Sequence, residues 1–378
     1  MARNEESDAK ITRKGKKRLK ILYISPEHTV GALSFWKMEH EKRGNECRYV
    51  TLFRSASGFK EDICLNLPFV STGKIYGALR KLAYRTHGEL GGGTEKDGYP
   101  PVWRPENAAE TLFFKTREFI WSGFIERAIR KYGLDQFDIY HLEWGMEFYR
   151  DGRFIRKMKN AGKRIVCTYH GQDMRNRGVI PAIDKLSELN LTSELDLMHK
   201  HPNINYLFLP FETTKFKPRT EPNDLITISH ATQQRRAKGS DHIIDVCIEL
   251  EKEGRIKFIL VENRPHFEVL EAKAKSDIYI DQITDIGWGY GMNSVEALSM
   301  GVVCCTKMNE EYEKFIPDHP FINVTAETLK PELSKIIVDR VKLKEKMIIS
   351  RNWVVKYHDI SNVVDKLYEY YKGIGIQQ

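Results

Sequence analysis

The chain contains 378 residues, of which 41% are apolar, 30% are charged and 11% are aromatic. This composition is typical of a folded globular protein and excludes an intrinsically disordered chain, and the length suits two domains rather than one. No apolar run approaches the roughly eighteen residues that a membrane-spanning helix needs, and no signal-peptide pattern opens the sequence, so we expect a cytoplasmic protein.

The formal charge of +8 is concentrated at the start of the chain. Residues 1–20 contain eight Lys or Arg and three acidic residues, a net charge of +5, so the rest of the chain carries only +3. We expect residues 1–18 to form a basic, flexible arm. Such an arm can contact an anionic membrane surface, although a solvated tail is the commoner outcome. No pattern of a nucleic-acid-binding fold accompanies it, so no nucleic-acid partner is expected.

The six cysteines form no CxxC pair, and most of them lie within apolar runs. They are expected to be reduced core residues. The pattern favours neither a disulfide framework nor a zinc site.

The first predicted element is a strand at residues 19–25 (LKILYIS), followed by a loop that contains Gly31. Residues 32–43 have the spacing of a helix that stops at Gly44, and residues 47–53 form a second strand. A strand, a glycine turn, a helix and a strand in this order indicate one half of a nucleotide-binding α/β domain. The GxGxxG motif is absent, so a dinucleotide site is not supported.

Two amphipathic helices are predicted in the less regular stretch 55–135, at residues 74–84 and 111–130. Both combine apolar side chains at helical spacing with Lys and Arg. Helices of this kind usually cover a core. The alternative is a basic and apolar helix that rests on a membrane surface.

A strand at residues 164–169 leads directly into HGQD, from His170 to Asp173. A strand at 137–142 and a helix at 153–160 precede it. Open α/β sheets bind ligands at the carboxyl ends of their strands, so His170 and Asp173 are candidate site residues. A lone histidine at such a position is otherwise a structural residue.

A polar, proline-containing stretch at residues 210–222 marks the predicted domain boundary, after a predicted helix at 183–200 and a strand at 205–209. We expect a first Rossmann-like domain at residues 19–212 and a second at 213–355.

The second domain again alternates strands and helices. Its predicted elements are strands at 225–229, 257–261 and 277–282 and a helix at 242–253. A terminal amphipathic pattern at residues 352–372 is broken near His358, and residues 356–378 are expected to form a C-terminal helix that packs back on the first domain.

Residues 277–306 combine a strand, a glycine-rich turn, a helix and a second strand. Glycines let the backbone approach a ligand, and the amino end of a helix attracts phosphate. Asn293 or Ser294 is the expected N-cap, and Glu296, in the expected first turn, is placed to accept hydrogen bonds from ribose hydroxyls. The alternative is a plain βαβ connection with a capping glutamate. The candidate ligand-binding residues are Gly289, Gly291, Asn293, Ser294 and Glu296.

Two of these segments resemble a family signature. HATQQRRAKGSDHII, from His230, and DIYIDQITDIGWGYGMNSVEALSMGVV, from Asp277, are similar to the pattern HAPxxRxxKGxxxII followed by aDIxIDQxxxGxxGxxxxEAMAxGxPV of the retaining GT-B glycosyltransferases called group 1 or family 4. YHGQDMR, from Tyr169, resembles the HGxDxR turn of that family. The resemblance covers nearly the whole chain and implies two Rossmann-like parallel-sheet domains that face each other across a cleft.

The resemblance implies a role for each candidate residue. Arg235 and Lys238 fall on the Arg and Lys that grip the donor diphosphate, where fixed cations stabilise the charge of the leaving group. Glu296 falls on the glutamate that holds the ribose, and His170 on the donor-facing histidine, with Asp173 beside it. Gly31 falls on the glycine of the first loop.

One departure affects the sugar end of the site. The family pattern has another glutamate eight residues before Glu296, and this chain has Trp288 there. Asp281 and Asp285 are the alternatives for holding the donor sugar.

The expected function is transfer of a sugar from a nucleotide-diphospho-sugar to an acceptor hydroxyl, with retention of configuration, in glycan or surface polysaccharide biosynthesis. The acceptor is a glycan, a lipid-linked molecule or another hydroxyl compound, and the basic arm allows a peripheral location at the inner face of the membrane. No DxD triplet occurs, so we expect neither a metal nor another cofactor. The alternatives are a non-hydrolysing nucleotide-sugar epimerase and a catalytically degenerate donor-binding or scaffold protein.

Overall fold

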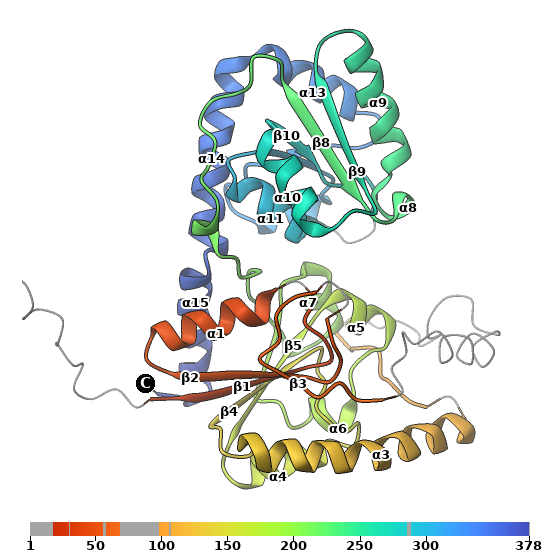
Figure 1. Cartoon of the computed structure of the whole chain (residues 1–378), viewed down its shortest axis with the longest axis vertical. Coiled ribbons are helices and arrows are strands. Elements are labelled where there is room, and N and C mark those ends of the chain that lie inside the picture. The colour runs from red at the N-terminus through yellow and green to blue at the C-terminus, as the bar shows by residue number, and fades with distance from the viewer. Residues whose placement is uncertain are drawn as a thin grey trace, which may run out of the picture.

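The computed structural model describes residues 18–29, 31–55, 58–68, 98–105, 107–285 and 289–377. The chain forms two lobes, each built on a parallel β-sheet covered by helices (Figure 1). The predicted fold class, two Rossmann-like α/β units, is confirmed. The basic arm, apart from Arg18, and the predicted helix at 74–84 lie outside the described residues.

The first lobe contains a seven-stranded sheet in the order β3-β2-β1-β4-β5-β6-β7. The elements of this lobe are β1 (Lys20–Ser25), α1 (Ala32–Lys42), β2 (Glu46–Thr51), β3 (Ile63–Cys64), α3 (Ala108–Tyr132), β4 (Ile139–Glu143), α4 (Arg153–Asn160), β5 (Arg164–Tyr169), α5 (Gly171–Asn176), α6 (Pro181–Asp184), β6 (Leu189–Thr192), α7 (Leu195–Lys200) and β7 (Asn205–Tyr206). All of these strands pair in parallel, so their carboxyl ends share one edge of the sheet.

Helices cover both faces of this sheet, which explains why its central strands are almost continuously apolar. On one face α3 and α4 pack through Trp121 and Phe154 against Leu22 of β1. On the other face α1 packs through Trp36 against Tyr23 of β1. Neighbouring residues of one strand therefore enter different cores, as the two-residue period of a strand requires.

The single helix predicted at residues 183–200 is wrong. The chain forms α6, then β6, then α7 in this stretch. Ile183, Leu186 and Leu189 have the three-residue spacing of a helix, but Leu189 and Leu191 belong to β6, and all four residues of β6 are buried between β5 and β7. Pairing with neighbouring strands decides between the two patterns, and that pairing is not visible in the local sequence.

The second lobe contains a five-stranded parallel sheet in the order β12-β11-β10-β8-β9. Its elements are the 3-10 helix η1 (Thr213–Lys215), β8 (Thr227–Thr232), α8 (Arg235–Lys238), α9 (Ser240–Lys252), β9 (Lys257–Glu262), α10 (His266–Lys275), β10 (Ile278–Ile280), α11 (Met292–Ser299), β11 (Val303–Thr306), α12 (Glu310–Phe315), β12 (Ile322–Asn323), α13 (Leu329–Val338) and α14 (Arg340–His358). Apolar residues of α11 and α14 fill the core on one face, and those of α9 and α13 fill the core on the other.

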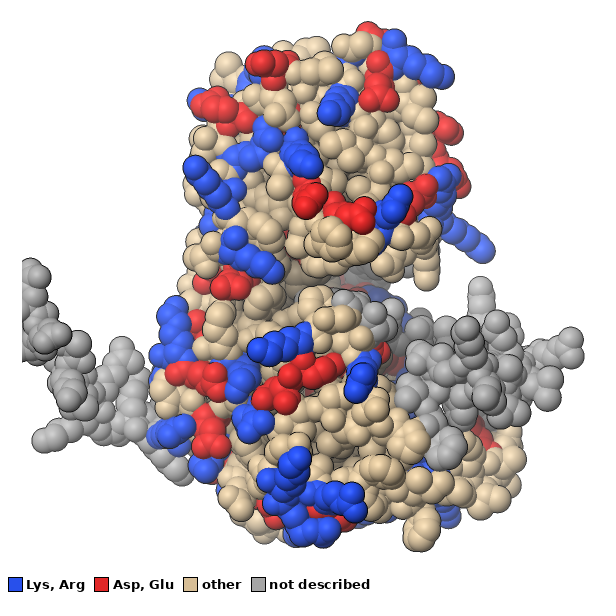
Figure 2. Space-filling view, in the orientation of Figure 1, with Lys and Arg blue, Asp and Glu red and all other residues tan. Residues whose placement is uncertain are grey.

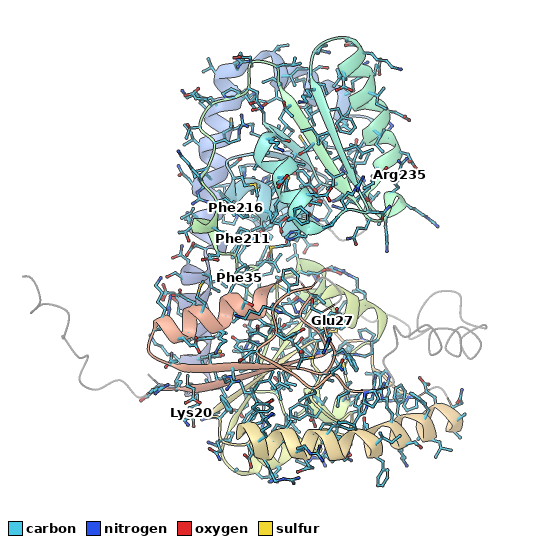
Figure 3. All side chains as sticks on the ribbon, in the orientation of Figure 1. Lys20, Glu27, Phe35, Phe211, Phe216 and Arg235 are labelled. Atoms are coloured by element: carbon cyan, nitrogen blue, oxygen red, sulfur yellow. The ribbon has the colours of Figure 1, made fainter. Side chains whose placement is uncertain are left out.

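The chain crosses twice between the lobes, and the two crossings are hydrogen-bonded to each other. The Phe211 N–H donates to the carbonyl oxygen of His358 at 2.8 Å, and the Ile360 N–H donates to that of Phe211 at 2.8 Å. The break predicted near His358 is this crossing, because α14 ends there and α15 (Ile360–Gly373) begins. Helix α15 then packs against α1 of the first lobe. Phe35 lies beside the crossing, with its ring centroid 5.7 Å from that of Phe211 (Figure 3).

Candidate functional site

The carboxyl edges of the two sheets face each other. Helix α8, which follows β8, lies on the side of the upper lobe that is turned toward the lower lobe, and α5, which follows β5, lies on the facing side of the lower lobe (Figure 1). The surface is hollowed between the lobes (Figure 2). Arg235 and Glu27 lie on opposite sides of this space (Figure 3). The elements that carry candidate residues in both halves of the sequence thus border one cleft.

A buried carboxylate lies at the carboxyl end of β10. Lys238 Nζ donates to Oδ1 of Asp281 at 2.5 Å, and Ser294 Oγ donates to Oδ2 at 2.5 Å. Burial alone raises the pKa of Asp281, but the charge and hydrogen bond of Lys238 and the hydroxyl of Ser294 outweigh burial and lower it. Asp281 is therefore ionised at neutral pH, and it fixes the position of the Lys238 ammonium.

A second buried carboxylate, that of Glu296, is held from two sides. Lys273 Nζ donates to Oε2 at 2.5 Å, and His266 Nε2 lies 2.7 Å from Oε1. The Lys273 side chain is fully buried and also donates to Oδ1 of Asn293 at 2.7 Å. Burial raises the pKa of Glu296, but the charges of Lys273 and His266 outweigh it and lower that pKa. The pKa of Lys273 is lowered, chiefly by burial.

Lys273 and His266 were not identified from the sequence. They lie seven residues apart on α10, so both fall on the same face of that helix, about two turns apart. This spacing was the available signal in the sequence, but nothing local indicates that this face of α10 is turned toward α11.

The expected N-cap of α11 is wrong. The helix begins at Met292 with Gly291 as its N-cap, two residues before Asn293 and three before Ser294. The side chains of Asn293 and Ser294 do not cap the helix because they contact Lys273 and Asp281. Glu296 is accordingly the fifth residue of the helix rather than a residue of its first turn.

The two described glycines before α11 differ in their surroundings. A Cβ atom on Gly289 would lie 2.7 Å from the ring of Tyr312, so packing alone requires a glycine there. A Cβ atom on Gly291 would meet no atom within 4 Å. Gly287 and Trp288, the residue in place of the first glutamate, lie outside the described residues. Asp285 is exposed and pairs with Lys307 at 2.7 Å.

Arg235 is held at the rim of the cleft. Its guanidinium group makes two hydrogen bonds to Glu262, both at 2.6 Å, and one to Asp241 at 2.9 Å. Its side chain is 48% exposed. Arg235 and Lys238 thus occupy the two ends of α8 with separate carboxylate partners.

On the first lobe, His170 and Glu143 lie at the carboxyl ends of the adjacent strands β5 and β4. His170 Nε2 donates to Oε2 of Glu143 at 2.8 Å. Burial alone lowers the pKa of His170, but the hydrogen bond to Glu143 and the charges of Glu143 and Asp173 outweigh it and raise that pKa to about 9. The imidazole is therefore a cation at neutral pH, with 29% of its side chain exposed. Glu143 is a third residue that was not identified from the sequence, after Lys273 and His266.

Asp173 is buried rather than exposed to the cleft. Its Oδ1 accepts a hydrogen bond from the backbone N–H of His170 at 2.7 Å, which caps α5. Asp173 therefore orients the turn that carries His170.

Gly31 lies beside Phe59 of the first lobe, and the Phe59 ring in turn lies near His266 of the second lobe. It is the N-cap of α1 with φ of 77°, and a Cβ atom there would lie 3.1 Å from the ring of Phe59. The Phe59 ring centroid is 6.3 Å from that of His266, the partner of Glu296. The structure thus brings the first glycine loop and the predicted ribose-binding residue into one neighbourhood.

The part of the chain that the structure describes lacks both a cluster of metal ligands and a membrane-spanning helix. No group of three or more His, Cys, Asp or Glu side chains is arranged to hold a metal ion there. No helix in the same part of the chain is both long enough and apolar enough to cross a membrane.

Solved structures share this two-lobed architecture. HepE from Anabaena, crystallised with UDP, aligns with a TM-score of 0.54 at 10% identity, covering 94% of this chain and 100% of its own. Sucrose-phosphate synthase from Thermosynechococcus elongatus aligns with a TM-score of 0.55 at 10% identity, covering 94% and 99%. The chain has the GT-B fold. A putative UDP-N-acetylglucosamine 2-epimerase from Listeria monocytogenes aligns at 13% identity with a TM-score of 0.50, covering 94% and 97%. No family model matches the chain, and no curated protein matches it in sequence.

Proposed function

We propose that this protein is a retaining glycosyltransferase of the GT-B type that uses a nucleotide-diphospho-sugar donor. The observation that carries the proposal is the pair of buried carboxylates, Asp281 and Glu296, at the edge of the second sheet that faces His170. Asp281 fixes Lys238 of α8 beside the amino end of α11, and Glu296 lies about one turn further along α11. This arrangement suits a ligand with a diphosphate and a hydroxylated ribose.

In the proposed reaction the bond between the sugar and the diphosphate breaks, and the acceptor oxygen bonds to the same face of the sugar. Lys238 and the cationic His170 stabilise the negative charge that the leaving diphosphate gains. The leaving phosphate takes the proton of the acceptor hydroxyl. Arg235 adds positive charge at the rim, and its existing bonds to Glu262 hold it in place.

The backbone N–H groups near Asn293 and Ser294 are proposed to contact the diphosphate, and Glu296 the ribose hydroxyls. Each oxygen of Glu296 already accepts one hydrogen bond in this structure, and we propose that the ribose takes the place of His266 on Oε1. His266 is the partner that can leave, because 45% of its side chain is exposed whereas that of Lys273 is fully buried.

The donor is identified by thermal unfolding in the presence of UDP-, GDP- and ADP-sugars. A ligand at about 100 times its Kd adds roughly 2.7 kcal/mol of stability. The matching donor should raise Tm, and Glu296→Gln should abolish the rise. An equal rise in Tm for the wild type and for Glu296→Gln would contradict the proposed contact between Glu296 and the ribose.

Transfer is then assayed with the matching donor and a panel of glycan and lipid-linked hydroxyl acceptors. A product that contains the acceptor, with the anomeric configuration of the donor, supports a retaining transferase. Conversion of the donor to its epimer without any acceptor would instead establish the epimerase alternative, a chemistry that the Listeria neighbour is named for. If Lys238→Ala and Glu296→Ala both left the biological activity unchanged, a scaffold role would be supported over both the glycosyltransferase and the epimerase hypotheses.

We also propose that transfer requires no metal ion. Activity should survive EDTA, because Lys238, His170 and Arg235 supply the positive charge at the diphosphate. A complete loss in EDTA that manganese restores would refute this. A role in surface polysaccharide biosynthesis at the inner face of the membrane is proposed on the resemblance alone.

A further inference from the structure

Helix α3 exposes a concentration of large apolar side chains. It carries five of the sixteen large apolar residues that are exposed in the described part of the chain. Phe119 is 80% exposed, Leu112 is 66% exposed and Phe124 is 51% exposed. Trp121 and Ile125 are buried in the core of the first lobe. Trp121 lies on the side of the helix opposite Leu112 and Phe119, whereas Phe124 lies beside the buried side. The exposed phenylalanines are therefore not needed to fix the helix on its sheet.

The same surface is basic. Exposed cations on α3 and the adjacent α4 are Lys115, Arg127, Arg130, Lys131, Arg153, Arg156 and Lys157, and of these Arg153 pairs with the exposed Asp151 at 3.1 Å. The two helices are joined by a hydrogen bond from Arg153 Nη2 to Ser122 Oγ at 3.4 Å. Figure 2 shows Lys and Arg gathered at the lower end of the molecule, where Figure 1 places α4. Glu126 is the one exposed acidic residue of α3.

We propose that α3 and α4 form a docking surface for an anionic lipid bilayer. Phenylalanine and leucine side chains enter the boundary between head groups and acyl chains, and the surrounding Lys and Arg contact the lipid phosphates. A helix that buries one side in its own lobe and exposes the other can lie flat on a bilayer. The excess of positive charge selects an anionic bilayer over a neutral one.

The combination of positive charge and exposed apolar area on α3 and α4 favours a lipid bilayer over nucleic acid as the partner. Nucleic acid would use the cations but leave Phe119 and Leu112 in water. A bilayer takes up both kinds of side chain at once, and Lys and Arg can extend their ends toward the phosphates. The surface lies on the side of the first lobe that is turned away from the second lobe (Figure 1), so docking leaves the cleft open. The proposal does not depend on the proposed activity.

The test is co-sedimentation of the full chain with vesicles of phosphatidylcholine alone and of phosphatidylcholine mixed with phosphatidylglycerol. The full chain should bind the mixed vesicles and not the neutral ones, and salt should weaken the binding. Arg127→Glu combined with Arg130→Glu should weaken binding at least about 100-fold, because each basic residue near an anionic leaflet contributes roughly fivefold and reversing its charge about doubles the effect in free energy. Phe119→Ser with Phe124→Ser should also release the protein.

Matched control variants lie on the other lobe. Val338→Ser with Val341→Ser removes two equally exposed apolar side chains, and Lys252→Glu with Lys342→Glu reverses two exposed charges. Both controls should bind like the wild type. All variants alter exposed positions, and an unchanged Tm confirms that each one folds.

Hydrogen exchange locates the contact. The amides of residues 108–132 should exchange more slowly with mixed vesicles than without them. Three outcomes would overturn the proposal: equal binding to neutral vesicles, equal losses in the control variants, or binding that disappears when residues 1–17 are deleted yet survives both α3 variants. The last outcome would assign membrane binding to the basic arm.

Discussion

Lys273→Met removes the buried cation that holds Glu296, and it should destabilise the protein strongly. The ammonium group donates to Oε2 of Glu296 at 2.5 Å and has no exposed surface. Breaking a buried ion pair by removing one partner costs about 3–5 kcal/mol, because a charge is left in a low dielectric. His266 still contacts Oε1, so we expect the lower end, about 3 kcal/mol. At about 2–4 °C per kcal/mol for a domain of this size, Tm should fall by about 6–12 °C.

The loss should depend on pH in a defined direction. In the wild type the pKa of Glu296 is lowered, so its contribution to stability is present above the unfolded pKa of about 4.3 and is lost as pH falls through the folded value. Without Lys273, burial dominates and raises this pKa, so the folded variant takes up a proton more readily than the unfolded chain. The difference in Tm between variant and wild type should therefore narrow as pH falls from about 7.5 to about 5.

Thermal unfolding across this pH range is the assay, with Lys275→Met as the matched control. Lys275 lies on the same helix, is 70% exposed and pairs only loosely with Glu271 at 3.9 Å, so its loss should cost less than about 1 kcal/mol. The double variant Lys273→Met with Glu296→Gln should recover much of the lost stability, since both charges are then absent. A difference that stays constant with pH, or a double variant as unstable as the single one, would refute the account of this pair.

Three further predictions concern other parts of the site. Glu143→Gln should lower the pKa of His170 from about 9 toward its usual value, and NMR titration measures this change. The His170–Glu143 pair stabilises the wild type below about pH 6.5, and this stabilisation is lost as pH rises through about 9. The variant should lack it. Gly31→Ala should cost about 1–2 kcal/mol in thermal unfolding, because φ is 77° and a Cβ atom would lie 3.1 Å from an aromatic ring. Lys238→Met should weaken binding of the nucleoside diphosphate of the matching donor about 10–100-fold in calorimetry, whereas Arg236→Met, an exposed change on the same short helix, should not.

Elements with one strong local signal could be predicted from the sequence. Strand β5 at 164–169 and helix α4 at 153–160 have the predicted limits, because the first is centred on the apolar, buried residues 165–167 and the second stops before a glycine at residue 162 with φ of 78°. β6 could not be predicted, because its four residues become a strand only through pairing with neighbours that are distant in sequence.

The site was harder to predict because its side chains contact one another instead of their own backbone. Asn293 and Ser294 have the right chemistry to cap a helix, and a local rule assigns them that role. In the structure the nearby charges of Lys273 and Asp281 provide stronger hydrogen-bonding partners, so Gly291 takes the cap position. The same cause explains the missed Lys273. A family pattern identifies the residues that contact a ligand, but it does not include a buried cation that another helix provides, such as Lys273 of α10.

The two carboxylates of the second lobe differ in how accessible they are to a ligand. Asp281 is bound by Lys238 and Ser294, which both belong to the predicted donor site, so its charge serves to position other ligand-binding groups. Glu296 is bound on one side by a fully buried lysine and on the other by His266, which is partly exposed and has its ring near Phe59 of the first lobe. A ribose that replaces His266 on Glu296 would also alter this contact between the lobes. We propose that donor binding is coupled to the relative position of the lobes through this imidazole. His266→Ala tests the coupling: a fall in donor affinity supports it, because the contact then helps to hold the cleft together, whereas a rise would show that His266 only competes with ribose.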